Sequence, residues 1–274
     1  MKKSMMGLLV AAVVFSLTSC SGTKKAKEDG TSQIEEAAVI AGSVPKAFLT
    51  EEVKAETILL LKDLPDPEIF YRIATDEVKI GIGNLNFLLP VSKVSELTSP
   101  AQKACAAGIY FADYNVLKVL GQPTAEIEGA LAELTSALNI TYVLNILQKP
   151  APSSKEDLTK FFSEQEDQII QELAANDKVD IQIELLSGIA AELAVVYANP
   201  SLVVQGDATS AGLTDNQIMR LEILNQITAD LTAYYPDLAQ LGETLSPLKD
   251  KVTSIQTARN ANAEILAIRD ALLK

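Results

Sequence analysis

The chain has 274 residues, a net charge of −13 and 48% hydrophobic residues, and it contains neither histidine nor tryptophan. The absence of histidine excludes Ser-His-Asp and Cys-His catalysis and imidazole-bound zinc. Because these catalytic residues are missing, we expect a protein that is not an enzyme and uses no cofactor. The acidic balance argues against binding of nucleic acid and anionic lipid heads, which need dense Lys and Arg.

Residues 1–19 have the pattern of a secretory signal peptide of the lipoprotein type. Two lysines precede an apolar run from Met5 to Leu17, and Cys20 follows two small residues. The run is shorter than the roughly 20 residues that a membrane-spanning helix needs. The sequence Leu-Thr-Ser-Cys resembles the bacterial lipobox, which implies cleavage before Cys20 and lipidation (palmitate) of that residue. The alternative is an ordinary secreted signal with a chance cysteine.

Residues 20–42 are rich in small and polar residues of mixed charge, which is typical of a flexible tether. Many lipoproteins of Bacteroidota carry an acidic run straight after the cysteine, and that run directs them to the cell surface. Here the first charges are lysines. By that resemblance we expect the protein in the cell envelope, attached by its lipid to the outer membrane and facing the periplasm.

Residues 43–274 form the predicted helical domain, because apolar residues recur in it at helical spacing. Proline, glycine and polar clusters separate the periodic segments. The predicted helices cover 45–65, 66–77, 100–120, 123–138, 140–148, 154–174, 181–197, 214–235 and 247–273. The fold class is therefore all-α, a single-domain bundle of eight to ten helices.

Capping residues mark several helix ends. Gly121 stands at the position that follows a helix C-terminus. Ser154 with Asp157, and Thr214 with Gln217, have the spacing of residues that cap a helix start. The segment 205–212 before Thr214 is rich in Gly, Ser and Thr, so we expect a loop there.

Residues 78–96 depart from the helical pattern. Apolar residues alternate at its start, which is compatible with a short strand. Two glycines and Pro90 favour a packed loop instead.

Two predicted helices are apolar on nearly every side, which places them in the middle of the protein. In the second, residues 181–197, Glu184 and Glu192 lie on one broad face. Such acids form a hard-ion site, an exposed stripe, or bonds to Lys or Arg of another helix. The calcium-loop spacing of acids is absent, so we expect no metal site.

Asp113 is the most informative charged residue, because it lies in the first of these apolar helices. A carboxylate buried there must be paired, hydrogen-bonded or protonated. Tyr110 precedes it by three residues and lies on the same helix face. The candidate ligand-binding residues are Tyr110, Asp113 and Glu192. The alternative is a structural acid bonded to a neighbouring helix end or tyrosine. We interpret Cys105, among alanines, as a small buried hydrophobe.

Three segments follow one another in order: "LPDPEIF" at 64–70, "LNFLLPVSKVSEL" at 85–97 and "KACAAGIYFADYNVLKVLGQ" at 103–122. They resemble a family of uncharacterised all-helical envelope lipoproteins of Bacteroidota. The matching residues are Leu64, Pro65, Pro67, Glu68, Leu88, Leu89, Val91, Gly108, Ile109, Tyr110 and Asp113. The chain departs from the pattern at Pro90 and Tyr114. The resemblance implies a helical envelope lipoprotein and no activity.

The leading hypothesis is a lipid-anchored, non-enzymatic helical protein that binds a partner protein or a small ligand in the envelope. The alternative is a carrier of a lipid or other apolar ligand in an internal cavity, suggested by the buried helices rich in small residues. A second alternative is a carboxylate-based metal-binding protein. The expected partners are the membrane, through the lipid, and an envelope protein or small apolar ligand, but no nucleic acid.

Overall fold

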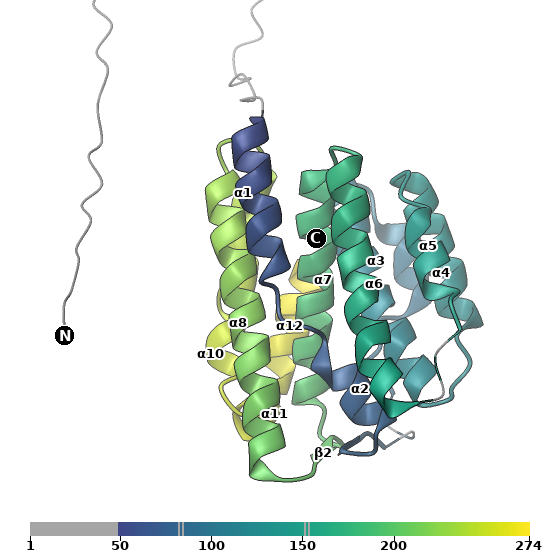
Figure 1. The fold of residues 1–274 in the computed structure, drawn as a ribbon. Helices are drawn as coiled ribbons and strands as arrows, with labels where there is room; N and C mark the ends of the chain where they lie inside the picture. The colour runs from purple at the N-terminus through teal and green to yellow at the C-terminus, as the bar shows by residue number, and fades with distance from the viewer. Residues whose placement is uncertain (1–48, 82, 84, 151, 153) are drawn as a thin grey trace, which may run out of the picture. The chain divides into compact units, whose positions relative to one another are not determined.

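Helices make up nearly all of the regular structure, and the all-α prediction is confirmed (Figure 1). The computed structural model describes residues 49–274 except 82, 84, 151 and 153. They belong to the compact unit Val44–Lys274. The predicted signal peptide, the tether and Cys20 lie outside the described residues.

Twelve α-helices lie in the described part of the chain, slightly more than the eight to ten predicted. Those of the first half are α1 (Glu51–Lys62), α2 (Glu68–Ala74), α3 (Pro100–Val119), α4 (Ala125–Ala137), α5 (Tyr142–Leu147) and α6 (Lys155–Ala175). Those of the second half are α7 (Val179–Ala198), α8 (Asp207–Leu231), α9 (Asp237–Leu245), α10 (Leu248–Lys251), α11 (Ile255–Asn260) and α12 (Asn262–Ala271). A 3₁₀ helix, η2 (Val91–Glu96), precedes α3.

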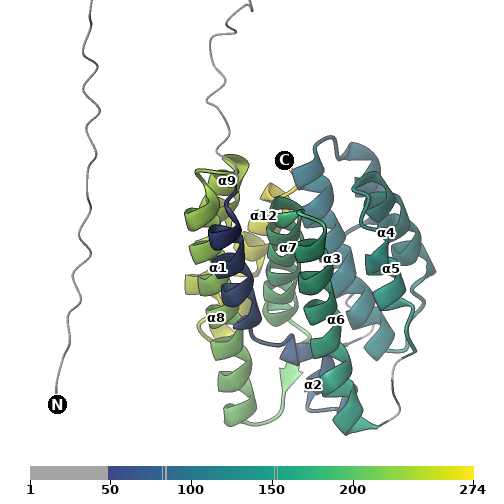
Figure 2. The same ribbon diagram turned by 45° about the horizontal axis from the view of Figure 1, so that its top comes forward.

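Helix α7 is the centre of the bundle, as its all-round apolar sequence predicts. It packs against α3, α6, α8, α9, α11 and α12, and every residue of it from Gln182 on is buried. Both views place α1 and α8 on one side of it and α4 and α5 on the other (Figures 1 and 2). Helix α3 is buried from Ala104 to Leu117.

The predicted caps at two helix ends are confirmed. Gly121 has a positive φ of 64°, and its N–H donates to the Lys118 carbonyl while that of Gln122 donates to Leu117. This pair of bonds satisfies the last carbonyls of α3. The hydroxyl of Ser154 accepts from the Asp157 N–H at 3.1 Å at the start of α6.

The predicted start of α8 at Thr214 is wrong, because the helix begins at Asp207. Gly206, with a φ of 86°, turns the chain there, and the carboxylate of Asp207 suits the positive end of a helix. Thr214 lies inside the helix, and its hydroxyl donates to the carbonyl of Ser210. Gln217 is buried and donates to the carbonyl of Ala190 in α7 at 2.7 Å.

The predicted last helix, 247–273, is divided into α10, α11 and α12. The hydroxyl of Ser254 accepts from the Thr257 N–H at 3.0 Å and begins α11 anew. A second break falls at Ala261, in the polar stretch that the sequence places between the apolar ends. The Ser254 cap thus accounts for the new start at α11, whereas no side-chain cap marks the start of α12.

Of the residues that the structure describes within 78–96, only the first two form the short strand that the sequence offered as one alternative. Strand β1 (Val78–Lys79) pairs antiparallel with β2 (Val203–Val204), with Val78 opposite Val204. The rest of the described part of this segment forms turns and η2, in accord with the packed loop.

Three arginines bind backbone carbonyls of the connections between helices. They are Arg220, which donates to Pro65, Arg259, which donates to Leu202, and Arg269, which donates to Phe87. Each bond joins segments that are far apart in the sequence.

Candidate functional site

Two glycines let α3 and α7 cross in direct backbone contact. A Cβ atom on Gly108 would overlap the carbonyl of Leu185, and one on Gly188 would overlap the carbonyl of Cys105. Only glycine permits this approach. The crossing explains the small residues of α3, and it brings the following turns of the two helices, which carry Asp113 and Glu192, side by side.

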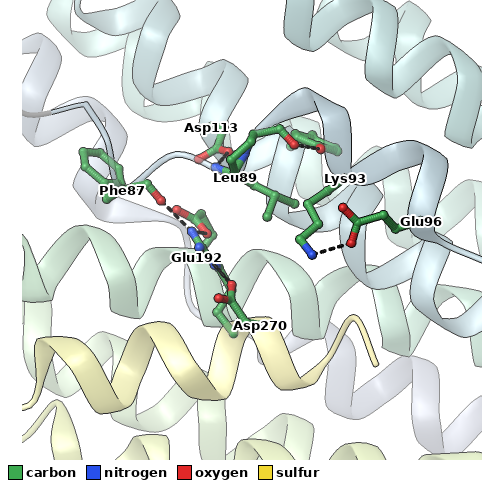
Figure 3. Close-up of polar contacts among 10 residues, drawn as sticks. Phe87, Leu89, Lys93, Glu96, Asp113, Glu192 and Asp270 are labelled. Carbon is green, nitrogen blue, oxygen red and sulfur yellow. Dashed lines mark hydrogen bonds and ion pairs between the residues drawn. The ribbon is translucent and has the colours of Figure 1, made fainter.

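Asp113 and Glu192 form a buried polar cluster with Arg269 of α12. Asp113 and Glu192 are completely buried, and Arg269 is 5% exposed. The Leu89 N–H donates to Asp113 Oδ2 at 3.0 Å, and Arg269 Nη1 donates to Glu192 Oε2 at 3.2 Å. Figure 3 shows the two acids beside Leu89 and the Phe87 carbonyl. The predicted alternative of a bond from Glu192 to an arginine of another helix is thus confirmed.

Burial raises the pKa of both acids, and it does so most strongly at Asp113. Burial raises the pKa of the Asp113 carboxyl well above its usual range, and the Glu192 carboxylate raises it further. Burial also raises the pKa of Glu192, but Arg269 and a hydrogen bond with Asp113 act against this rise. These directions favour a neutral Asp113 next to a Glu192 carboxylate that balances the charge of Arg269.

Two members of the cluster, together with Tyr110, hold loop 87–90 in place through three of its backbone groups. Arg269 Nη1 donates to the Phe87 carbonyl at 2.5 Å, the Leu89 N–H donates to Asp113, and the Tyr110 hydroxyl donates to the Pro90 carbonyl at 2.8 Å. Burial, and then Asp113, raise the pKa of Tyr110, so its hydroxyl remains a donor. Loop 87–90 is thus fixed by side chains of α3 and α12.

A cleft of about 710 Å³ lies against the other side of this loop. It is open to solvent, and its volume falls within the size range of small-molecule sites. Loop 87–90, the start of η2, the end of α3 and the start of α4 form its walls. The lining residues are Leu88, Leu89, Pro90, Val91, Ser92, Leu117, Pro123, Ala125, Glu126 and Ile127.

The predicted ligand-binding residues Tyr110, Asp113 and Glu192 come together behind the wall of the cleft, and none of them lines it. Their binding role stays a prediction. Glu184 lies apart from them, in a second pocket of about 400 Å³ between α3, α7 and α9.

Sequence reasoning missed Arg269, although a signal for it exists. It stands four residues after Ile265 and three before Leu272, which are both buried, and therefore lies on the inward stripe of its helix. A charged residue at such a position requires a buried partner. The interpretation of Cys105 as a buried hydrophobe is confirmed, because burial raises the pKa of its thiol and the side chain is 3% exposed.

In the described residues, no group of three or more acidic or cysteine side chains could hold a metal ion. The Arg269 cation beside Asp113 and Glu192 disfavours a second cation there. None of the helices between residues 49 and 274 that the structure describes is long and apolar enough to cross a membrane. Comparison with known proteins finds no matching family, no matching curated protein and no matching solved structure.

Proposed function

We propose that the protein is a lipid-anchored, non-enzymatic binding protein of the bacterial cell envelope, which holds a small apolar ligand in the cleft beside loop 87–90. The observation that carries this proposal is the cleft itself. Eight of its ten lining residues are apolar, and its volume suits a single alkyl chain or a ring system.

The buried cluster supports the proposal because it gives the cleft a fixed wall. Three hydrogen bonds fix loop 87–90 from behind, so a ligand would meet a surface that is already ordered. Preformed sites avoid the entropic cost of ordering a loop on binding.

The apolar ligand is favoured over a partner protein by the distribution of exposed apolar side chains. Among the described residues, the large exposed ones are Leu59, Val91, Val203 and Met219. They lie on four different elements, α1, η2, β2 and α8, and give no single helix an apolar outer face.

The anchor part of the proposal follows from the signal pattern and Cys20. An alkyne analogue of palmitate, fed to the producing bacterium, should label the mature protein, and Cys20→Ala should abolish the label. Equal labelling of the Cys20→Ala variant would contradict the anchor. The outcome of this labelling experiment does not depend on what the cleft binds.

The cleft is tested with an introduced fluorophore, because the chain contains no tryptophan. Ser92→Trp places one indole at the rim of the cleft, and Ser136→Trp, at an exposed site near the end of α4, is the matched control. Both are made in a chain that begins at Ser21 and so keeps the whole compact unit.

Dodecyl maltoside, below its micelle concentration, is the probe. A saturable blue shift of the emission of Ser92→Trp, with no change in Ser136→Trp, is expected, because the chain would shield only the rim indole from water. The same response in both variants, or none in either, would overturn the proposed site.

A further inference from the structure

The cleft carries a negative charge and no positive one. Apart from Ser92, its only polar lining residue is Glu126, and neither lysine nor arginine lines it. An apolar ligand with a charged end would therefore meet a single carboxylate at the rim.

The lysines nearest to the lining residues in sequence are occupied elsewhere. Lys93, which follows Ser92, pairs with Glu96 at 2.6 Å. Lys118, which follows Leu117, donates to the carbonyls of Leu147 at 3.0 Å and Lys149 at 3.1 Å. Neither is available to bind an anionic group in the cleft without losing these bonds.

Glu126, by contrast, is available to a ligand. It is exposed in the first turn of α4 and forms no hydrogen bond or ion pair with another described residue. Its neighbour Glu128 differs, because the Thr124 hydroxyl donates to it at 2.6 Å.

We infer that the ligand of the cleft is a cationic amphiphile, with an alkyl body against the apolar walls and an amine or quaternary ammonium group beside Glu126. This inference rests on the proposed function. An anionic amphiphile of the same length would place its carboxylate near Glu126 with no cation to balance it, in a protein whose net charge is already −13.

The test compares three ligands that share a dodecyl chain: dodecyltrimethylammonium, dodecyl maltoside and dodecanoate, each below its micelle concentration. Affinities are measured from the emission of Ser92→Trp, alone and combined with Glu126→Gln. The combination with Glu133→Gln is the matched control, because Glu133 is exposed on the same helix but does not line the cleft.

The ammonium ligand should bind about two- to five-fold more tightly than the maltoside, as expected of one exposed ion pair, and dodecanoate should bind more weakly than both. Glu126→Gln should remove the ammonium preference and leave maltoside binding unchanged, whereas Glu133→Gln should change neither. Higher salt should reduce the preference.

Two results would overturn the inference while leaving the proposed function intact. One is equal affinity for all three ligands. The other is an ammonium preference that Glu126→Gln and Glu133→Gln reduce equally, since that would reflect net charge alone. Failure of the proposed function would give a different result, because none of the three ligands would then cause a saturable change in the emission of Ser92→Trp.

Discussion

Replacing Asp113 with asparagine should make the protein more stable relative to the wild type as the pH rises. The amide oxygen of Asn can still accept the Leu89 N–H, and its NH₂ group can donate to Glu192 as the neutral acid does. Asp113→Asn therefore copies the protonated state of the pair and keeps loop 87–90 in place. Unlike the acid, it has no proton to lose.

The sign follows from the raised pKa of Asp113 in the folded protein. In the unfolded chain an aspartate titrates near about 3.9. Between that pH and the raised pKa, the folded state binds one more proton than the unfolded state. The free energy of unfolding thus falls with rising pH, by up to about 1.4 kcal/mol per pH unit. Asp113→Asn removes this proton, so its stability relative to the wild type should rise over the same range.

Urea unfolding at a series of pH values between about 4 and 8 measures the effect, with Glu133→Gln as the control for loss of an exposed acid. Asp113→Ala should instead destabilise the protein at every pH, by about 1–3 kcal/mol, because the buried Leu89 N–H loses its acceptor. Parallel curves of unfolding free energy against pH for wild type and Asp113→Asn would refute the raised pKa of Asp113.

Three further substitutions test the architecture around the site. Gly108→Ala should lower the free energy of unfolding by about 3 kcal/mol or more, because its methyl group would force α3 away from α7; Gly129→Ala, where nothing lies within 4 Å, should be neutral or stabilising in the same urea assay. Arg220→Met should cost about 3–5 kcal/mol by leaving the buried Glu166 carboxylate unpaired, and adding Glu166→Leu should recover part of the loss in a double-mutant cycle. Tyr110→Phe should lower the free energy of unfolding by about 1–3 kcal/mol and weaken maltoside binding, because loop 87–90 loses one of its hydrogen bonds; unchanged binding would show that this hydrogen bond does not matter for the ligand.

Periodicity and caps were enough to predict the fold class and its centre. The segment that became α7 is apolar on every side, so no arrangement could leave it on the surface, and Gly121 marks the end of α3 by local geometry alone. The start of α8 was missed because the spacing of Thr214 and Gln217 matches that of a capping pair, and the sequence alone does not distinguish a capping pair from two residues inside a helix. Their hydrogen bonds depend on the rest of the helix and on α7.

The candidate site could be predicted only in part, because its partners come from distant segments. The sequence indicates that Asp113 is a buried acid, and it leaves Glu192 open between an exposed stripe, an ion site and a bond to another helix. It does not say which cation faces them. That depends on the packing of α12 against α7. The cleft is still harder to predict from the sequence, because its walls come from a loop and from the ends of two helices, and these segments share no sequence motif.

The arginines that bind the helix connections make the fold independent of redox conditions. Many proteins of oxidising compartments secure their loops with disulfides. Here the described part of the chain has one cysteine, Cys105, which is buried and unbonded, and the connections at Pro65, Phe87 and Leu202 are secured by guanidinium groups instead. The domain should therefore fold equally well with or without reductant.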